Sequence, residues 1–194
     1  MAPSLLLASK SPRRRELLSA AGFQFDTAAP QVDERSDINL SLREITALNA
    51  VRKGLAVARV YTQKIVLSAD TLVALDHKII GKPHDRDHAA DILRRLSGRV
   101  HEVCSSVFIL HLARARSTMF YEISRVRFRR LDDRAIDDYF TKVNPLDKAG
   151  AYAAQGYGAE IISRIEGSHT NVVGLPMEKT IAALAKFGIK PANS

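Results

Sequence analysis

LLLASKSPRRRELLSAAG, residues 5–22, predicts a strand that leads directly into a helix. Leu5 to Leu7 form a short apolar run typical of a buried strand, Ser11 is a favoured helix N-cap, and Pro12 has the backbone angle of a first helical residue. Gly22 is a common residue just after a helix ends. We therefore expect the helix to begin at Pro12 and to end before Gly22.

The order of charges in this expected helix points to a bound anion. Arg13, Arg14 and Arg15 occupy the first turn, where the helix dipole is already positive and each cation costs roughly 0.3 to 1 kcal/mol. An anion would offset this cost if backbone N–H groups, an arginine fork and the hydroxyls of Ser9 and Ser11 held it. The alternative is three solvated arginines on an exposed turn.

The composition predicts one globular domain over residues 1–194, divided into two lobes. Of its 194 residues, 46% are hydrophobic and 26% are charged, which argues against a disordered chain. No apolar run has the length of a membrane span, and the N-terminus lacks the residue order of a signal peptide. We therefore expect a cytoplasmic protein that does not interact with a membrane. The single cysteine, Cys104, cannot form a disulfide or a thiolate metal site within the chain.

The net charge indicates an acidic partner. The chain has 29 lysines and arginines against 21 acidic residues, which gives a formal charge of +8. Such a balance suits nucleic acid or a small polyphosphate, and charge alone does not choose between them.

Two separate positions offer carboxylates for chemistry. Ile65 to Leu67 is a predicted buried strand that delivers Asp70 at its C-terminal end, where open α/β sheets place ligand-binding groups. Asp33 and Glu34 lie in a polar loop. Paired acids in a loop are commonly just solvated, but these are also able to hold a divalent cation.

Two lysines are candidates for phosphate contacts. Ser41 and Glu44 form a capping box for a helix that we expect to reach about Val60, and Lys53 lies beside its apolar stripe. A flanking lysine whose stem covers apolar surface is the alternative for Lys53. Lys82 stands between a glycine and a proline after an expected hairpin, a setting that presents its charge to a phosphate.

The remaining pattern alternates strands and helices. Neither GxxxxGK[ST] nor GxGxxG is present, so the phosphate loop of many kinases and ATPases is missing. His84 and His88 are four residues apart, but no acidic residue completes a metal motif and a first-turn position explains them more simply.

The other expected elements are a strand over 23–28, a hairpin of 72–75 and 78–80 turning at Asp76-His77, a helix over 85–98, strands over 100–112 and 118–131, a helix from 132 or 133 to 143, a strand over 161–165 and a helix over 176–187.

Nine short motifs follow one another along nearly the whole chain. They are ASKSPRR at 8–14, Asp33-Glu34, NAVRKG at 49–54, SADT at 68–71, GKP at 81–83, LSGR at 96–99, LDKAGAY at 146–152, Gln155-Gly156 and NVVGLP at 171–176. Taken together, these motifs resemble the Maf family of nucleoside triphosphate pyrophosphatases. The resemblance implies an α/β fold of two lobes, with a mixed sheet and flanking helices, similar to that of the inosine triphosphate pyrophosphatases. It also implies a cleft for the nucleotide, a divalent metal that is usually magnesium with manganese as an alternative, and a homodimer.

The reaction implied is attack of water between the α- and β-phosphates, which yields a nucleoside monophosphate and pyrophosphate. Asp70 is the implied general base or holder of the metal, and Glu34 is the second metal contact. Protein groups in such a step mainly position the substrate and neutralise charge. The groups assigned to the phosphates are Ser9, Ser11, Arg13, Arg14, Lys53 and Lys82.

Three positions indicate which base is recognised. Arg13, Thr71 and Gln155 match the branch of the family that acts on dTTP and UTP. A branch that prefers 7-methylguanosine triphosphate tends to have tryptophan, glutamine and glutamate there, and it is the alternative. A neutral glutamine amide can donate to and accept from a uracil or thymine edge.

A nucleic-acid-binding regulatory protein is the main rival from another class. Its case rests on the charge of +8, but the basic residues lie in separate loops and no cluster of stacking aromatics accompanies them. We therefore expect no nucleic-acid partner. The chain departs from the family pattern at three places: Gly54 replaces a common alanine, His77 replaces a turn glycine in a hairpin that favours positive φ, and Ala153-Ala154 replaces a Gly-Ile pair.

Overall fold

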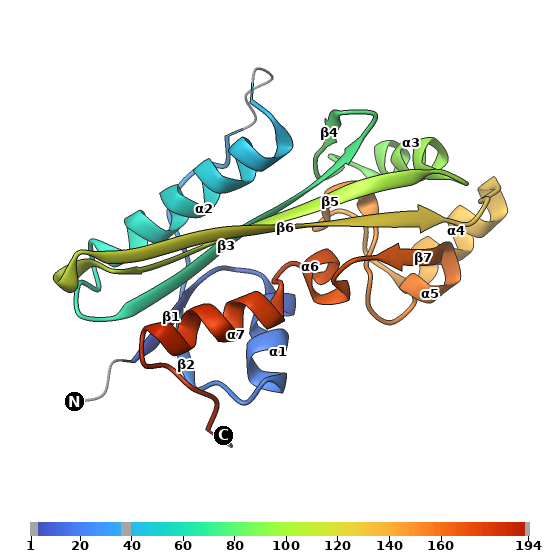
Figure 1. Cartoon of the computed structure of the whole chain (residues 1–194). Helices are drawn as coiled ribbons and strands as arrows, with labels where there is room; N and C mark the ends of the chain where they lie inside the picture. The colour runs from blue at the N-terminus through green and yellow to red at the C-terminus, as the bar shows by residue number, and fades with distance from the viewer. Residues whose placement is uncertain (1–3, 36–39, 193–194) are drawn as a thin grey trace.

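One mixed sheet organises the computed structural model, which describes residues 4–35 and 40–192 (Figure 1). Its strand order is β2-β1-β3-β5-β6-β7, and β4 pairs with β3. β1 is parallel to both β2 and β3, and all other pairs are antiparallel. The strands are β1 Leu5–Ala8, β2 Phe25–Ala28, β3 Ile65–Leu75, β4 Lys78–Ile80, β5 Val100–His111, β6 Arg116–Phe128 and β7 Ile162–Glu166.

Helices cover both faces of the sheet. In Figure 1, α2 lies on one side of the long strands β3, β5 and β6, while α1 and α7 lie on the other. The helices are α1 Pro12–Ala20, α2 Leu42–Ala58, α3 Arg86–Leu96, α4 Asp133–Lys142, α5 Gly158–Ile161, α6 His169–Val173 and α7 Met177–Lys186, with short 3-10 turns at Leu112–Arg114 and Ala149–Ala151. Within the described residues, no helix combines the length and apolar character needed to cross a membrane.

Strand β1 is buried on both faces because successive side chains serve different helices. Leu5 and Leu7 belong to a core cluster with residues of α1 and α7. Leu6 and Ala8 belong to a second cluster, which includes residues of α2. The two-residue period of a strand therefore requires a continuous apolar run here.

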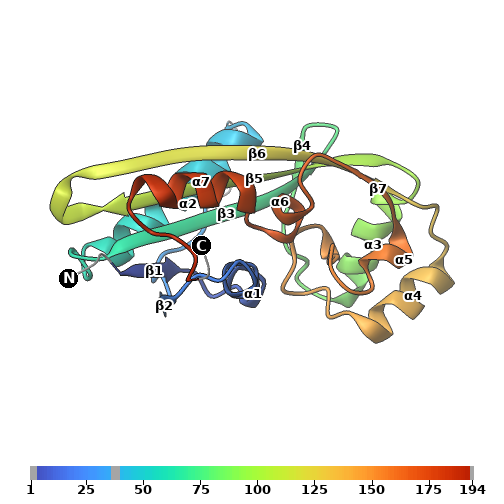
Figure 2. The ribbon, with the colours of Figure 1, turned by 60° about the horizontal axis from the view of Figure 1, so that its bottom comes forward.

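A second lobe gathers at the far end of the long strands, where Figure 2 shows α3, α4 and α5 together. Its core contains Ile92 and Leu96 of α3, Ile136 and Tyr139 of α4, and Phe128 at the end of β6. These helical residues are spaced three and four apart, as one apolar helix face requires. The mixed α/β architecture with flanking helices confirms the predicted fold class.

Local signals predicted several element boundaries correctly. Ser41 and Glu44 form both bonds of the capping box at the start of α2. Asp76 and His77 have φ values of 49° and 63°, so the hairpin turn does use positive φ without a glycine. The strand expected from residue 23 begins only at Phe25, because Phe23 donates its N–H to the Leu18 carbonyl at 3.1 Å and closes the end of α1.

Helix α2 packs against the sheet at Gly54. A Cβ atom at this position would lie 2.6 Å from Ser68 Oγ and 2.7 Å from Phe108 Cδ1, closer than atoms of these types approach. Ser68 Oγ also donates to the Ala50 carbonyl at 2.7 Å. The missing methyl group thus lets α2 sit directly on β3 and β5.

Candidate active site

A cleft of about 1130 Å³ receives side chains from both lobes. The α1 end supplies Ser9, Ser11, Arg13 and Arg14, and the glycine-rich segment supplies Asp147. The other predicted site residues that line it are Glu34, Lys53, Asp70, Thr71 and Lys82. The volume suits a nucleotide-sized ligand.

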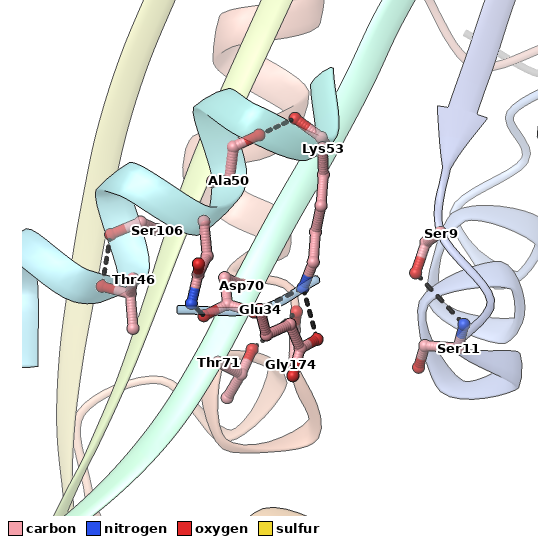
Figure 3. A network of polar contacts seen from close by, with 12 residues as sticks. Ser9, Ser11, Glu34, Thr46, Ala50, Lys53, Asp70, Thr71, Ser106 and Gly174 are labelled. Atoms are coloured by element: carbon pink, nitrogen blue, oxygen red, sulfur yellow. Dashed lines mark hydrogen bonds and ion pairs between the residues drawn. The ribbon is translucent and has the colours of Figure 1, made fainter. Parts of the chain in front are cut away.

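The centre of the cleft is an ion-pair cluster around Lys53 (Figure 3). Lys53 Nζ lies 2.6 Å from Asp70 Oδ1 and 2.7 Å from Glu34 Oε1, and Lys53 is 7% exposed. Glu34 Oε2 lies 3.8 Å from Lys82 Nζ. Lys53 is therefore a buried partner of two acids, which rules out the alternative of a lysine that only flanks the apolar stripe.

The carboxylate of Glu34 is stabilised in its charged form. Its partial burial opposes ionisation, but the hydrogen bond and charge of Lys53, with the charges of Lys82 and Arg14, outweigh that effect and lower the pKa of Glu34. Glu34 thus presents a negative charge to the cleft at neutral pH.

Asp70 lies inside a strand, which corrects its expected place at a strand end. β3 runs without interruption from Ile65 to Leu75, and Asp70 pairs with Ser106 of β5. On its other side β3 has β1 as a partner only as far as Ser68, which pairs with Ala8. Asp70 therefore follows directly after the point where β1 ends, and its side chain reaches the cleft there.

The arginines of the first helical turn have different surroundings. Arg14 is buried, and it donates to Gly174 O at 2.8 Å, Thr71 Oγ1 at 3.0 Å and Ser9 Oγ at 3.3 Å. Burial lowers its pKa from the ordinary arginine value, with Asp70 as the largest opposing charge. Arg15 is exposed. Of the three arginines in this turn, only Arg15 therefore fits the alternative of a solvated side chain.

Arg13 joins the two lobes at the cleft. Its Nη1 donates to Asp147 Oδ2 at 3.0 Å, and Lys148 Nζ lies 2.5 Å from Asp147 Oδ1. Partial burial of Asp147 opposes its ionisation, but the hydrogen bonds and charges of Lys148 and Arg13 together outweigh that effect and lower the pKa of Asp147. A ligand phosphate would compete with this carboxylate for Arg13.

The start of α1 is as predicted, but its cap is not. Ser11 precedes the helix with extended backbone angles, yet its hydroxyl makes no capping bond. Its N–H donates to Ser9 Oγ at 3.1 Å, a bond drawn as a dashed line in Figure 3. Ser11 lines the cleft, and its hydroxyl has no capping role in the helix.

Of the three residues predicted to recognise the base, the structure places two, Arg13 and Thr71, in the wall of the cleft. Thr71 and Arg13 line the cleft, and Thr71 Oγ1 also bonds to Ser105 Oγ at 2.8 Å. Gln155 is not among the described residues that line it, although Ala153 and Ala154 just before it are. The far wall near this segment is largely apolar; Val73, Val103, Tyr152 and Val172 contribute to it.

Sequence reasoning assigned no role to Asn49, which contacts Asp70. Asn49 Nδ2 donates to Asp70 Oδ2 at 3.2 Å. The sequence signal was its spacing, because Asn49 precedes Lys53 by four residues and so shares its helix face.

The carboxylates of Asp70 and Glu34 are suited to hold a divalent metal ion if substrate phosphates supply further ligands. Asp70 and Glu34 direct oxygens at the single point where Lys53 Nζ lies. Over residues 4–35 and 40–192, no group of three His, Cys, Asp or Glu side chains could enclose a metal. Magnesium characteristically uses one or two carboxylates together with phosphate oxygens, and these two residues suit that arrangement. Outside this cluster, His84 Nδ1 lies 2.8 Å from Asp85 Oδ2, and its ring lies 4.2 Å from that of His88 at a tilt of 36°.

Comparisons with known proteins show what this chain is similar to. The family model described as "Maf-like protein" matches residues 4–187. A dTTP/UTP pyrophosphatase of Bacillus pumilus is 43% identical over 96% of this chain and 98% of its own. Those of Clostridioides difficile and Bacillus velezensis are 38% and 42% identical, over 95% and 98% of this chain and 95% and 100% of theirs. A HAM1 protein structure from Coxiella burnetii matches with a TM-score of 0.45 and 14% identity, over 66% of this chain and 74% of its own.

Proposed function

This chain belongs to the Maf-like protein family, and we propose that it hydrolyses dTTP and UTP to the nucleoside monophosphate and pyrophosphate. The observation that carries the proposal is the Lys53 cluster, in which one ammonium group holds two acids at the centre of a basic cleft. The names of the similar proteins support the activity and the two substrates.

The proposed roles follow from the positions of the charged groups. Asp70 orients the attacking water and accepts its proton, and Lys53 and Lys82 neutralise charge that develops on the phosphates. Arg13 and Arg14, with Ser9 and Ser11, hold the outer phosphates at the start of α1. The basic groups counteract the repulsion between a triphosphate and the two acids.

We propose that the cofactor is Mg²⁺, with Mn²⁺ as an alternative, held by Asp70 and Glu34 together with substrate phosphates. Such an ion would neutralise phosphate charge and orient the water. For this, Lys53 would have to share the two carboxylates with the ion, since it contacts both.

Several further properties remain predictions. A continuous sheet that runs through both lobes supports a single domain over residues 1–194. The homodimer and the cytoplasmic location rest on the sequence resemblance and on composition. Recognition of the pyrimidine is assigned to Arg13, Thr71 and Gln155, and the position of Ala153 and Ala154 in the cleft wall supports a base near Gln155.

The proposed function predicts a clear order of substrates. We expect kcat/KM for dTTP and UTP to exceed that for 7-methylguanosine triphosphate by at least ~100-fold, because a buried polar mismatch leaves groups of the site unpaired. Steady-state kinetics at one magnesium concentration, with both products identified, test this. A preference for the methylated purine would overturn the pyrimidine assignment. Release of orthophosphate would contradict the reaction class.

Arg13 should contribute to triphosphate affinity measured as thermal stabilisation. A non-hydrolysable UTP analogue at 100 times Kd should stabilise the wild type by about 2.7 kcal/mol, which corresponds to roughly 5 to 10 °C. Arg13→Ala should weaken binding about tenfold, which removes about 1.4 kcal/mol and hence about half of the shift. Arg15→Ala is the matched control, because Arg15 is exposed in the same turn. Equal shifts in the two variants would place the phosphates elsewhere.

A further inference from the structure

Asn49 is a buried amide that contacts both acidic segments of the cleft. Its Nδ2 donates to Asp70 Oδ2 at 3.2 Å and to the Arg35 carbonyl at 3.0 Å, and its Oδ1 accepts the Arg35 N–H at 2.9 Å. It is 2% exposed. These partners determine the orientation of the amide, because a carboxylate and a carbonyl only accept whereas a backbone N–H only donates.

We propose that Asn49 is a positioning residue that holds Asp70 and the Glu34 loop in the geometry needed for nucleotide hydrolysis, a role that rests on the proposed function. Asn49 acts through these two acids and not by touching the phosphates. Its spacing of four residues from Lys53 lets one helix face hold both acids, with an ammonium group and with an amide.

The first part of this role concerns the plane of the Asp70 carboxylate. Asp70 Oδ1 accepts from Lys53 at 2.6 Å, and Asp70 Oδ2 accepts from Asn49. Rotation of the carboxylate breaks at least one of these bonds. A general base or metal-binding acid needs its reactive oxygen within a few tenths of an ångström of its place, and two donors on two oxygens provide that restraint.

The second part concerns the loop that carries Glu34. Residues 29–35 belong to no helix or strand, so the loop lacks the hydrogen-bond ladder that would fix its backbone. Asn49 binds both the N–H and the carbonyl of Arg35, the residue directly after Glu34. This clamp keeps Glu34 Oε1 within reach of Lys53, at 2.7 Å.

Asn49→Asp tests the role with almost no change of shape. The new carboxylate still accepts the Arg35 N–H, but it cannot donate to Asp70 or to the Arg35 carbonyl. We expect kcat for dTTP to fall roughly 30-fold, the size expected when a charged group loses a hydrogen bond, while KM changes less than about threefold. Thr46→Val is the matched control. Thr46 lies one turn earlier on α2 and is equally buried, but it bonds to Ser106 and to helix carbonyls.

A double-mutant cycle with Asp70→Asn adds a readout that does not need activity. Asn49→Asp alone places two carboxylates face to face and should lower Tm, whereas the exchanged pair Asn49→Asp with Asp70→Asn restores a donor and an acceptor and should recover most of that loss. If Asn49→Asp does not fold, Asn49→Ala carries the kinetic test, with the same fall in kcat expected.

The outcomes separate this role from the proposed function. A wild type that hydrolyses no nucleoside triphosphate overturns the proposed function and the role with it. An active wild type whose Asn49 variants keep kcat, or lose no more than Thr46→Val does, overturns the role alone. A fall in kcat at nearly constant KM, together with recovery of Tm in the exchanged pair, supports it.

Discussion

Asp70→Asn should lower kcat for dTTP by at least ~100-fold while the protein remains folded. The amide keeps the shape of the side chain but cannot accept a proton from water or supply a charged metal ligand. Lys53 retains Glu34 as a partner at 2.7 Å, so the fold keeps a counterion for its buried ammonium group. Steady-state kinetics on the purified variant, with Tm as the test of folding, measure the effect.

The control for this variant is Asp26→Asn. Asp26 also accepts from a lysine, Lys64, at 2.5 Å, but this pair lies outside the cleft, with Asp26 largely and Lys64 partly exposed. Its loss should leave kcat unchanged, since exposed pairs contribute little. Near-normal turnover of folded Asp70→Asn would remove Asp70 from the chemistry.

Lys53→Met should reduce both turnover and stability. Without the ammonium group, Glu34 and Asp70 face each other with no cation between them, and breaking a buried pair in this way costs about 3 to 5 kcal/mol. Loss of one preorganised charge at the phosphates should lower kcat by at least ~100-fold. Lys64→Met, at the exposed pair, is the matched control and should change the free energy of unfolding by less than about 1 kcal/mol.

The same variant should change how stability depends on pH. In the wild type the pKa of Glu34 lies below its ordinary value, so its contribution is complete above the unfolded-state pKa and is lost as the pH falls through the folded-state pKa. In Lys53→Met the group that lowers this pKa most is gone while burial, which raises it, remains, so the pKa of Glu34 should rise. The gain in stability as the pH rises from the folded-state to the unfolded-state pKa should then become smaller. Denaturant unfolding between pH 3 and 7 measures the slope, and an unaltered slope would contradict the coupling of Glu34 to Lys53.

Features set by neighbours in the sequence were predictable, and those set by distant partners were not. The capping box of Ser41 and Glu44 and the start of α1 at Pro12 depend on local geometry, so the sequence predicted both. The continuity of β3 through Asp70 depends on pairing with β5, which local polarity obscured. Asp70 interrupts the apolar pattern of the strand because its side chain lines the cleft.

In the candidate site, too, contacts between residues far apart in the sequence were not predictable. The resemblance to the Maf family implied that Lys53, Asp70 and Glu34 belong to one site, but not that Lys53 bridges the two acids. The different surroundings of Arg14 and Arg15 depend on Gly174 and Thr71, which are far away in sequence. No periodicity in the segment around Asn49 identifies its partner at Arg35, because that contact joins a helix to an irregular loop.

The close packing at Gly54 sets the distance between α2 and the sheet, and this distance determines whether the side chain of Lys53 can contact Asp70. Lys53 extends from the same turn of α2 down to Asp70, so a helix raised by one methyl group would withdraw its ammonium group from the acids. The side chains of Ser68 and Phe108 therefore occupy the space that a Cβ atom at position 54 would need. In evolution, a chain of this kind can gain an alanine there only as its partners shrink or turn away, so the three positions should covary as a set.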